Sequence, residues 1–270
     1  EIIAPWVSRS GDGGKNWKKL SKDDGIPEGD LGRTGLTIAY NEPSRVYAKV
    51  EATKNGLYKT WLDKIASFML DLKGKEGEYI PVIFRPFHEL NGSWFWWGKN
   101  HCTPEEVKQL YRFTETYLRD NKNVHNLLYA YNTDRFATFE EYLERYPGDD
   151  YVDVIGFDIY QKGDIRSNEK FIKELDKSLT ILETMATDKN KIPALTEFGF
   201  NQVPDAKWWT EVFYKALAPH HISFVLAWRN AGKKSANEIE YYAPYKGQQS
   251  AEDFIVFYNL PKTFFQKEIT

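Results

Sequence analysis

Two glutamates, Glu89 and Glu197, each follow an apolar run and have aromatic residues nearby. Two carboxyl groups can together cleave a glycosidic bond when one gives a proton to the leaving oxygen and the other, ionised, attacks the sugar carbon. Burial beside the run Trp94-Phe95-Trp96-Trp97 should raise the pKa of Glu89, as a proton donor requires. A hydrogen bond from Tyr160 could hold Glu197 as a carboxylate. Taken singly, each glutamate is better explained as an ion-paired residue at the rim of a sheet, but the pair together is harder to explain that way.

The elements that must position these side chains alternate between strands and helices from residue 61 onward. Five apolar runs predict strands: Ile80–Pro86, Asn126–Tyr131, Asp153–Asp158, Pro193–Glu197 and Ser223–Trp228. Helical spacing or capping residues predict helices at Trp61–Leu72, after Thr103-Pro104-Glu105-Glu106, and at Thr138–Tyr146, Glu169–Thr187 and Asp205–Leu217. This alternation is typical of a parallel sheet wrapped by helices. We expect an α/β fold of the (β/α)8 TIM-type barrel class rather than a doubly wound sheet, because polar residues cluster after every strand.

Each predicted strand ends in side chains suited to a functional site. They are His88-Glu89, Asn132-Thr133-Asp134, Asp158-Ile159-Tyr160, Glu197 and Trp228-Arg229-Asn230. The carboxyl ends of parallel barrel strands open on one face, where the sites of such enzymes are built. We therefore expect these side chains to converge.

Residues 1–60 follow a different pattern. Alternating residues predict strands at Gly35–Asn41 and Ser44–Thr53, joined by a turn. The segment Ser10–Trp17 has the spacing of a tight hairpin in which Asp12 binds backbone amides, and it resembles a single Asp-box repeat of the β-propellers found in sialidases and xyloglucanases. We expect residues 1–60 to form a small all-β segment without a catalytic residue, and residues 61–270 to form the catalytic domain.

Composition excludes some partners. The 270 residues carry a formal net charge of −3, so no basic field exists to attract nucleic acid or anionic lipid. No apolar run is long enough to span a membrane, and the single cysteine, Cys102, allows no internal disulfide. Aromatic residues reach 16%, which indicates either a bulky core or rings that stack on sugars. The histidines lack metal-ligand spacing, so no metal or other cofactor is predicted.

Four stretches of the chain resemble glycoside hydrolase family 26, the first of them closely. The stretch Arg85–Gly98, which contains His88-Glu89, resembles the acid/base motif of that family. Ala194–Gly199 resembles its nucleophile strand, and Leu226–Ala231 its eighth strand, while residues 241–257 are similar to its C-terminal tail. The resemblance covers about residues 61–270.

The resemblance implies an activity and a role for each site residue. The family consists mostly of retaining endo-β-1,4-mannanases, so Glu89 would be the acid/base and Glu197 the nucleophile. The implied substrate-binding residues are His88, Trp94, Asp158, Tyr160, Trp228 and Arg229, with Tyr160 also orienting the nucleophile. A rim ion pair explains Asp158 and Arg229 about as well. The implied partner is a β-mannan such as glucomannan or galactomannan.

The first strand after residue 61 corresponds to strand four of the family's barrel. The usual first three strands are therefore not recognisable, which leaves a fusion, an artificial joint or a truncated barrel as explanations. Activity on β-glucan or β-xylan, a non-catalytic carbohydrate-binding role and a sialidase-like enzyme remain alternatives. A polysaccharide substrate implies a secreted, periplasmic or cell-surface protein. The chain contains no signal peptide, which fits either a mature secreted protein or a cytoplasmic one. The sequence does not predict an oligomeric state.

Overall fold

The computed structural model describes residues 56–236 and 238–265, together with four short strands nearer the N-terminus. Strands β1 (Ser8–Arg9) and β2 (Lys18–Lys19) pair antiparallel, as do β3 (Thr34–Ala39) and β4 (Glu42–Val50). The predicted Ser10–Trp17 turn lies outside the described residues. Contacts divide the chain into two units, one of residues 1–82 and 112–127, the other of residues 83–111 and 128–270.

In the first unit, helix α1 (Leu57–Asp71) begins at Leu57 rather than at the predicted Trp61. Its buried face carries Leu62, Ala66 and Met69 at helical spacing. Asp63 lies beside this buried face and joins the helix to residues 117–122, where it pairs with Lys122 at 2.6 Å and accepts a hydrogen bond from the Tyr117 hydroxyl at 2.8 Å.

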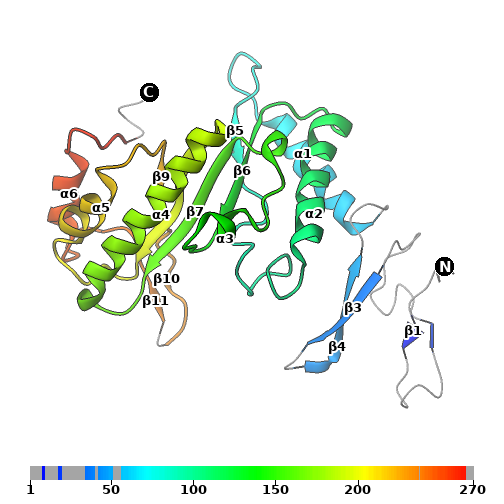
Figure 1. Cartoon of the computed structure of the whole chain (residues 1–270), viewed down its shortest axis with the longest axis horizontal. Coiled ribbons are helices and arrows are strands. Elements are labelled where there is room, and N and C mark those ends of the chain that lie inside the picture. The colour runs from blue at the N-terminus through cyan, green and yellow to red at the C-terminus, as the bar shows by residue number, and fades with distance from the viewer. Residues whose placement is uncertain are drawn as a thin grey trace. The chain divides into compact units, whose positions relative to one another are not determined.

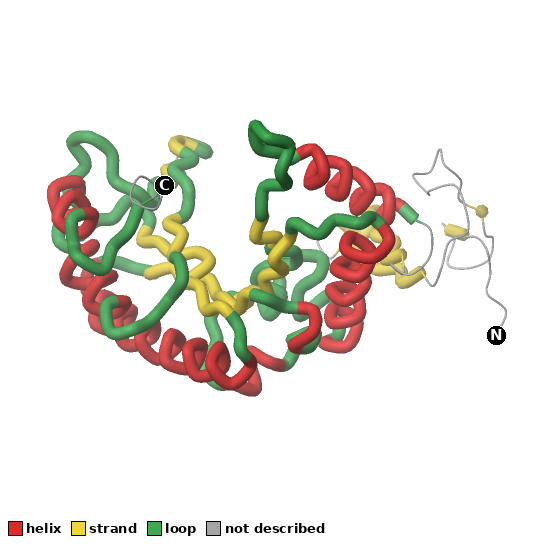
Figure 2. Tube along the Cα trace, turned by 90° about the horizontal axis from the view of Figure 1, so that it is seen from above, coloured by secondary structure: helices red, strands yellow, loops and turns green. Residues whose placement is uncertain are grey.

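The second unit is built on a sheet whose strands follow one another in sequence order (Figure 1). The strands are β5 (Val82–Phe84), β6 (Leu127–Thr133), β7 (Val154–Gln161), β8 (Ile192–Phe200) and β9 (Val225–Ala227). The pairs β6–β7, β7–β8 and β8–β9 are parallel. All five predicted strands are therefore present, in the order that β/α units produce. Figure 2 shows the strands of this unit along the inner side of a curve and its helices outside.

Helices and turns connect the strands. They are α2 (Pro104–Thr116) with a π-helical extension (Tyr117–Asn121), α3 (Phe139–Leu143), 3-10 turns at Asp149–Tyr151 and Ile165–Ser167, and α4 (Asn168–Lys189). After β8 come a π-helix (Trp208–Tyr214), α5 (Lys215–Leu217), the hairpin of β10 (Gly232–Lys233) and β11 (Ile239–Glu240), and α6 (Ala251–Tyr258).

The start of α2 confirms its predicted capping residues. The Thr103 hydroxyl accepts a hydrogen bond from the backbone N–H of Glu106 at 3.3 Å, and the Glu106 carboxylate accepts one from the N–H of Thr103 at 2.8 Å. This reciprocal pair satisfies two donors that the helix leaves free. The helix predicted over Asp205–Leu217 is also present, but it is π-helical from Trp208 to Tyr214 rather than α-helical throughout.

The core lies between the sheet and its outer helices. Helix α4 buries one stripe of its surface, formed by Phe171, Leu175, Leu179 and Leu182, toward β7 and β8. Burial of each such side chain contributes about 1.5–3 kcal/mol relative to an exposed one. Farther along, the Phe198 ring of β8 stacks on Phe213 with centroids 3.9 Å apart. The apolar packing lies on the outer face of the sheet. The carboxyl ends of the strands are not needed for it and carry polar groups.

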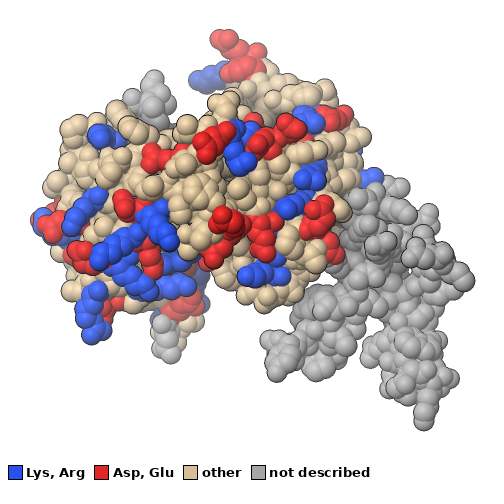
Figure 3. Space-filling model, viewed as in Figure 1, with Lys and Arg blue, Asp and Glu red and all other residues tan. Residues whose placement is uncertain are grey.

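On the face shown in Figure 3, Lys and Arg side chains are interspersed with Asp and Glu. This distribution fits the small net charge of −3. Among the described residues, every helix is too short or too polar to cross a bilayer.

Candidate active site

Glu197 lies within β8 and is only 4% exposed. Its two carboxylate oxygens have different partners. The Tyr160 hydroxyl, near the end of β7, donates a hydrogen bond to Oε2 at 2.6 Å, and the Arg85 guanidinium forms an ion pair with Oε1. Both partners are donors that stabilise the ionised carboxylate. A register shift between Phe157 and Asp158 of β7 places Asp158 opposite Glu197.

Arg85 connects three strands, although the sequence did not single it out. It follows β5, and its guanidinium contacts Glu197, the Asn132 amide oxygen and Asp158, the last at 3.1 Å. A basic residue directly after an apolar strand needs carboxylate partners, because an unpaired buried charge is costly. The position of Arg85 directly after an apolar strand therefore indicates an ion pair, but the sequence does not identify its carboxylate partners.

Asp158 is fully buried and is held by protein groups. Besides Arg85, its Oδ1 accepts hydrogen bonds from Asn132 Nδ2 at 3.2 Å and Thr196 Oγ1 at 2.9 Å. Burial raises the pKa of Asp158, and the Arg85 guanidinium opposes this effect. This placement favours the ion-pair alternative for Asp158 over direct contact with a substrate.

Glu89 has a contrasting position in the loop after β5 and is half-buried. Its φ of 51° and the φ of 56° at Phe87 lie in the left-handed region that non-glycine residues rarely adopt. Such strain persists only where surrounding contacts enforce it. The Trp94 indole N–H donates to Glu89 Oε2 at 2.7 Å. Desolvation by burial raises the pKa of Glu89 and outweighs the lowering effect of Trp94, in the direction predicted from the sequence.

The aromatic run after Glu89 packs on itself and on His88. Phe95 and Trp97 stack with centroids 4.5 Å apart, and His88 lies 4.6 Å from Phe95. The Trp97 indole N–H donates to the backbone oxygen of His88 at 2.9 Å. A Cβ at Gly92 would come within 2.5 Å of the Trp94 ring, so glycine permits that ring to fold back toward Glu89. The loop therefore supplies its own apolar surroundings.

The structure brings the two glutamates together. One carboxylate oxygen from each of Glu89, Asp158 and Glu197 lies within 4.8 Å of the others. Oxygens this close favour the spacing of about 5–5.5 Å between carboxyl groups at retaining glycosidases over the roughly 6.5–9.5 Å of inverting ones. Three carboxylates could in principle bind a cation. Here the Arg85 guanidinium already pairs with two of them, which disfavours a second positive charge.

The remaining predicted residues differ in exposure. Trp94 is 55% exposed and Trp228 is partly exposed, so each can present part of its ring. The exposed Arg229 guanidinium lies 5.6 Å from the centre of the Trp228 ring, a cation–π distance. His88 is half-buried, and desolvation together with Arg85 lowers its pKa, which favours the neutral imidazole.

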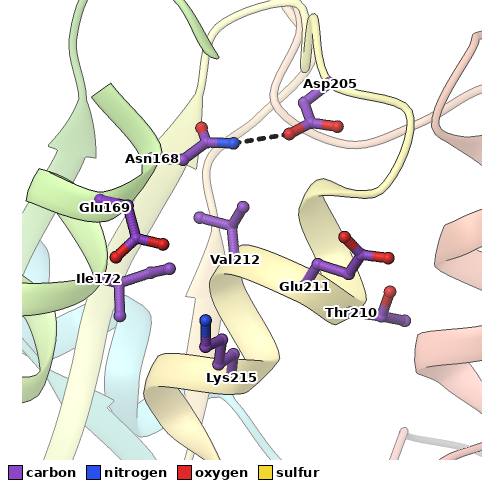
Figure 4. Close-up of a pocket in the computed structure, with 8 residues that line it drawn as sticks. All are labelled: Asn168, Glu169, Ile172, Asp205, Thr210, Glu211, Val212 and Lys215. Carbon is purple, nitrogen blue, oxygen red and sulfur yellow. Dashed lines mark hydrogen bonds between the residues drawn. The ribbon is translucent and has the colours of Figure 1, made fainter. Parts of the chain in front are cut away.

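A hollow elsewhere on this unit does not contain the glutamate pair. It lies between α4 and the π-helix of Trp208–Tyr214 (Figure 4). Its charged lining residues are Glu169, Asp205, Glu211 and Lys215, and Asn168 donates a hydrogen bond to Asp205 at 2.7 Å. Neither Glu89 nor Glu197 is among its lining residues.

Two carboxylates so close together, one beside aromatic side chains and one in an ion pair, have the arrangement that glycoside hydrolysis requires. Comparison with known proteins gives the family. The profile of Glycosyl hydrolase family 26 matches residues 26–225, and the chain belongs to this family. The match begins before the predicted division at residue 60, so it includes part of the segment interpreted as separate.

Characterised relatives and solved structures agree with this assignment. A mannan endo-1,4-β-mannosidase of Bifidobacterium adolescentis is 38% identical over 218 residues, covering 75% of this chain and 22% of that protein. The GH26 β-mannanase BoMan26A of Bacteroides ovatus has 46% identity and a TM-score of 0.73, covering 80% of this chain and 62% of that one. The catalytic domain of a Bacillus sp. JAMB-750 GH26 endo-β-1,4-mannanase has 33% identity and a TM-score of 0.73, covering 82% and 64%. The chain thus spans under two thirds of each of these proteins.

Proposed function

We propose that this chain is the catalytic part of a retaining endo-β-1,4-mannanase, with Glu89 as acid/base and Glu197 as nucleophile. The observation that carries the proposal is the approach of their carboxylate oxygens to within 4.8 Å in unlike surroundings. Relatives named as mannan endo-1,4-β-mannosidases support β-1,4-mannan as the substrate.

In the first step, Glu197 attacks the anomeric carbon of the sugar while Glu89 gives its proton to the leaving glycosidic oxygen. The bond from that carbon to the leaving oxygen breaks, and a glycosyl ester of Glu197 forms. Burial raises the pKa of Glu89, which keeps a proton on this carboxyl at higher pH than in water. Arg85 and Tyr160 each contact one oxygen of Glu197 and orient it for the attack.

In the second step, the now ionised Glu89 takes a proton from water, whose oxygen attacks the anomeric carbon and releases Glu197. The Trp94 indole N–H stabilises Glu89 in this ionised state through its 2.7 Å hydrogen bond. Two inversions at one carbon retain the configuration. His88, Trp94, Trp228 and Arg229 are the proposed substrate-binding residues, with the Trp rings stacking on sugars.

The test is release of reducing sugar from β-mannan, lichenan and β-xylan by the purified chain, with the first-formed anomer read by NMR. We expect hydrolysis of mannan above the other two, short oligosaccharides from internal cleavage, and the β-anomer as first product. A first-formed α-anomer would overturn the retaining mechanism. Preference for lichenan or xylan would overturn the substrate assignment, and binding without hydrolysis would leave a carbohydrate-binding protein.

We further propose that β5–β9 correspond to strands four to eight of a (β/α)8 barrel, so that the usual first three strands are missing and residues 1–60 form a small all-β, Asp-box-like segment. The correspondence to strands four to eight is supported by five strands that follow one another in sequence order and by the parallel pairing of β6–β7, β7–β8 and β8–β9. A secreted, periplasmic or cell-surface location is also proposed, because a polymeric substrate must be met outside the cytoplasm. Detection of the protein in a culture's cytoplasmic fraction alone would contradict it.

A further inference from the structure

The ring of Tyr242 lies against the tyrosine that holds the nucleophile. Tyr242 and Tyr160 meet edge-on, with ring centroids 5.4 Å apart and planes at 66°. On the same side, Tyr242 covers Gly199 of β8, two residues after Glu197. A Cβ added at Gly199 would lie 2.3 Å from Tyr242 Cδ1. The Tyr242 ring thus fills the space beside both Tyr160 and the strand that carries Glu197.

The backbone around Tyr242 is held by the residue Asn230, which follows β9. Asn230 Oδ1 accepts hydrogen bonds from the N–H groups of Tyr242 and Ala243, both at 2.9 Å. Asn230 Nδ2 donates to the backbone oxygen of Ala243, also at 2.9 Å. One amide side chain therefore satisfies three backbone groups of the segment that carries Tyr242.

A second set of hydrogen bonds joins the preceding residue to the end of β8. The Tyr241 N–H donates to Asn201 Oδ1 at 3.1 Å, and the Gln202 N–H donates to the Tyr241 oxygen at 2.6 Å. Asn201 Nδ2 also donates to the Ile239 oxygen at 3.1 Å. Hydrogen bonds thus hold the segment 239–243 to residues that follow β8 and β9. The backbone of Tyr242 is therefore fixed in position beside Tyr160.

The contact between the Tyr242 ring and Tyr160 matters for the proposed chemistry. A single hydroxyl joins the Tyr160 ring to Glu197, and a ring free to turn about its side-chain bonds would carry that hydroxyl away. We propose that Tyr242 is a positioning residue that acts through Tyr160, keeping the Tyr160 hydroxyl on Glu197 during attack and release. The inference rests on the proposed function, because it assigns Glu197 the nucleophile's role.

The experiment is a double-mutant cycle on mannan hydrolysis between Tyr242→Ala and Tyr160→Phe. Alone, Tyr242→Ala should lower kcat roughly tenfold with little change in KM, since positioning acts on the reacting groups more than on binding. In the Tyr160→Phe background it should lower kcat by less than about twofold, because the hydroxyl it positions is gone. A merely structural role would give the same loss in both backgrounds, and that result would overturn the inference.

Three further variants complete the test. Tyr242→Phe keeps the ring and should retain the wild-type kcat. Gly199→Ala should impair kcat from the opposite side by displacing the ring, and it takes the place of Tyr242→Ala if that variant melts early. Tyr245→Ala removes an exposed tyrosine three positions after Tyr242, outside residues 239–243, and should leave kcat unchanged. If the wild type is active and Tyr160→Phe lowers kcat but Tyr242→Ala does not, the inference is overturned and the proposed function stands. An inactive wild type overturns the proposed function and the inference together.

Discussion

The surroundings of Glu89 and Glu197 differ in almost every respect. Glu89 is half-buried in a loop with a left-handed backbone, and its described hydrogen-bond partner is Trp94, five positions along the same loop. Glu197 is buried within a strand and is held by Arg85 and Tyr160, which follow or belong to other strands. The first setting raises the pKa of Glu89 and so favours a carboxyl that keeps its proton, whereas the second fixes the position of both Glu197 oxygens. One side-chain type thus serves two roles because its environment differs.

The two settings also differ in how they are built. The Glu89 environment is local, since its apolar cover comes from the aromatic residues that directly follow it. The Glu197 environment is assembled by the sheet, and its Arg85 partner is 112 positions away in the chain. Local surroundings can be altered by one loop substitution without disturbing the fold. Sheet-built surroundings couple the site to the stability of the strands.

The sharpest test of this difference compares Glu89→Gln with Glu197→Ala. Both should lower mannan hydrolysis by several orders of magnitude, since each removes one half of the reaction. They should separate on an aryl mannoside whose leaving group needs no protonation. There Glu89→Gln should still release a stoichiometric burst of the aryl group, because attack by Glu197 is intact, whereas Glu197→Ala should release none. Wild-type turnover by either variant would remove that residue from the mechanism.

Arg85→Met tests the part of the site that the sheet assembles. It removes the cation that stabilises Glu197 and leaves Asp158 without its ion-pair partner. We expect kcat to fall by about 10²–10³, the usual cost of removing one preorganised charge partner. Breaking a buried pair should also cost about 3–5 kcal/mol of stability.

Urea unfolding measures the stability loss, and Arg166→Met is the matched control. Arg166 pairs with Asp164 at the surface, where its side chain is 88% exposed, so its removal should alter neither quantity. Arg85→Lys keeps the charge but not the planar fork, and should recover stability better than rate. An Arg85→Met variant as stable and active as Arg166→Met would show that the sheet-built surroundings do not matter.

The local and assembled halves of the site were not equally predictable. Trp94 and Glu89 are five positions apart, and the aromatic run around them is visible in the sequence, so the raised pKa of Glu89 could be expected. Five continuous apolar runs likewise predict the strands, because parallel strands are buried on both faces. The predicted bounds of the elements were less exact. Helix α1, for example, begins at Leu57, one turn before the predicted Trp61.

Arg85 could not be assigned from the sequence, although it contacts both Glu197 and Asp158. Those contacts span 112 and 73 positions and depend on which strands are neighbours and in what register. The register shift at Asp158 in β7, which sets Asp158 opposite Glu197, has no composition signal. The segment 239–243 illustrates the same limit, since its contact with Tyr160 appears only once the chain is folded.

Smaller effects are expected from the stacking residues. Trp94→Ala and Trp228→Ala should each weaken substrate handling by about 1–3 kcal/mol, the scale of losing a large ring face. The two substitutions should change different kinetic constants, because Trp94 also donates a hydrogen bond to Glu89, the proposed acid/base. Trp228→Ala should raise KM with kcat preserved, whereas Trp94→Ala should change both. Kinetics on mannan oligosaccharides separate these terms, and a Trp228→Ala variant with wild-type KM would remove Trp228 from the binding site.

The smallest expected change concerns the pH profile of Trp94→Phe, which keeps an apolar ring and removes only the indole donor. That hydrogen bond stabilises the ionised form of Glu89 and so lowers its pKa against the raising effect of burial. Without it, the pKa of Glu89 should rise further. The acid must be protonated to act, so activity is lost as the pH rises through this pKa, and the basic limb of kcat/KM should move to higher pH. Trp96→Phe, in the same aromatic run but packed edge-on against Phe87, should leave that limb in place. A basic limb that stays fixed or moves to lower pH in Trp94→Phe would show that the loop does not set the proton affinity of Glu89, and the contrast between the two glutamates would then have to arise from the sheet alone.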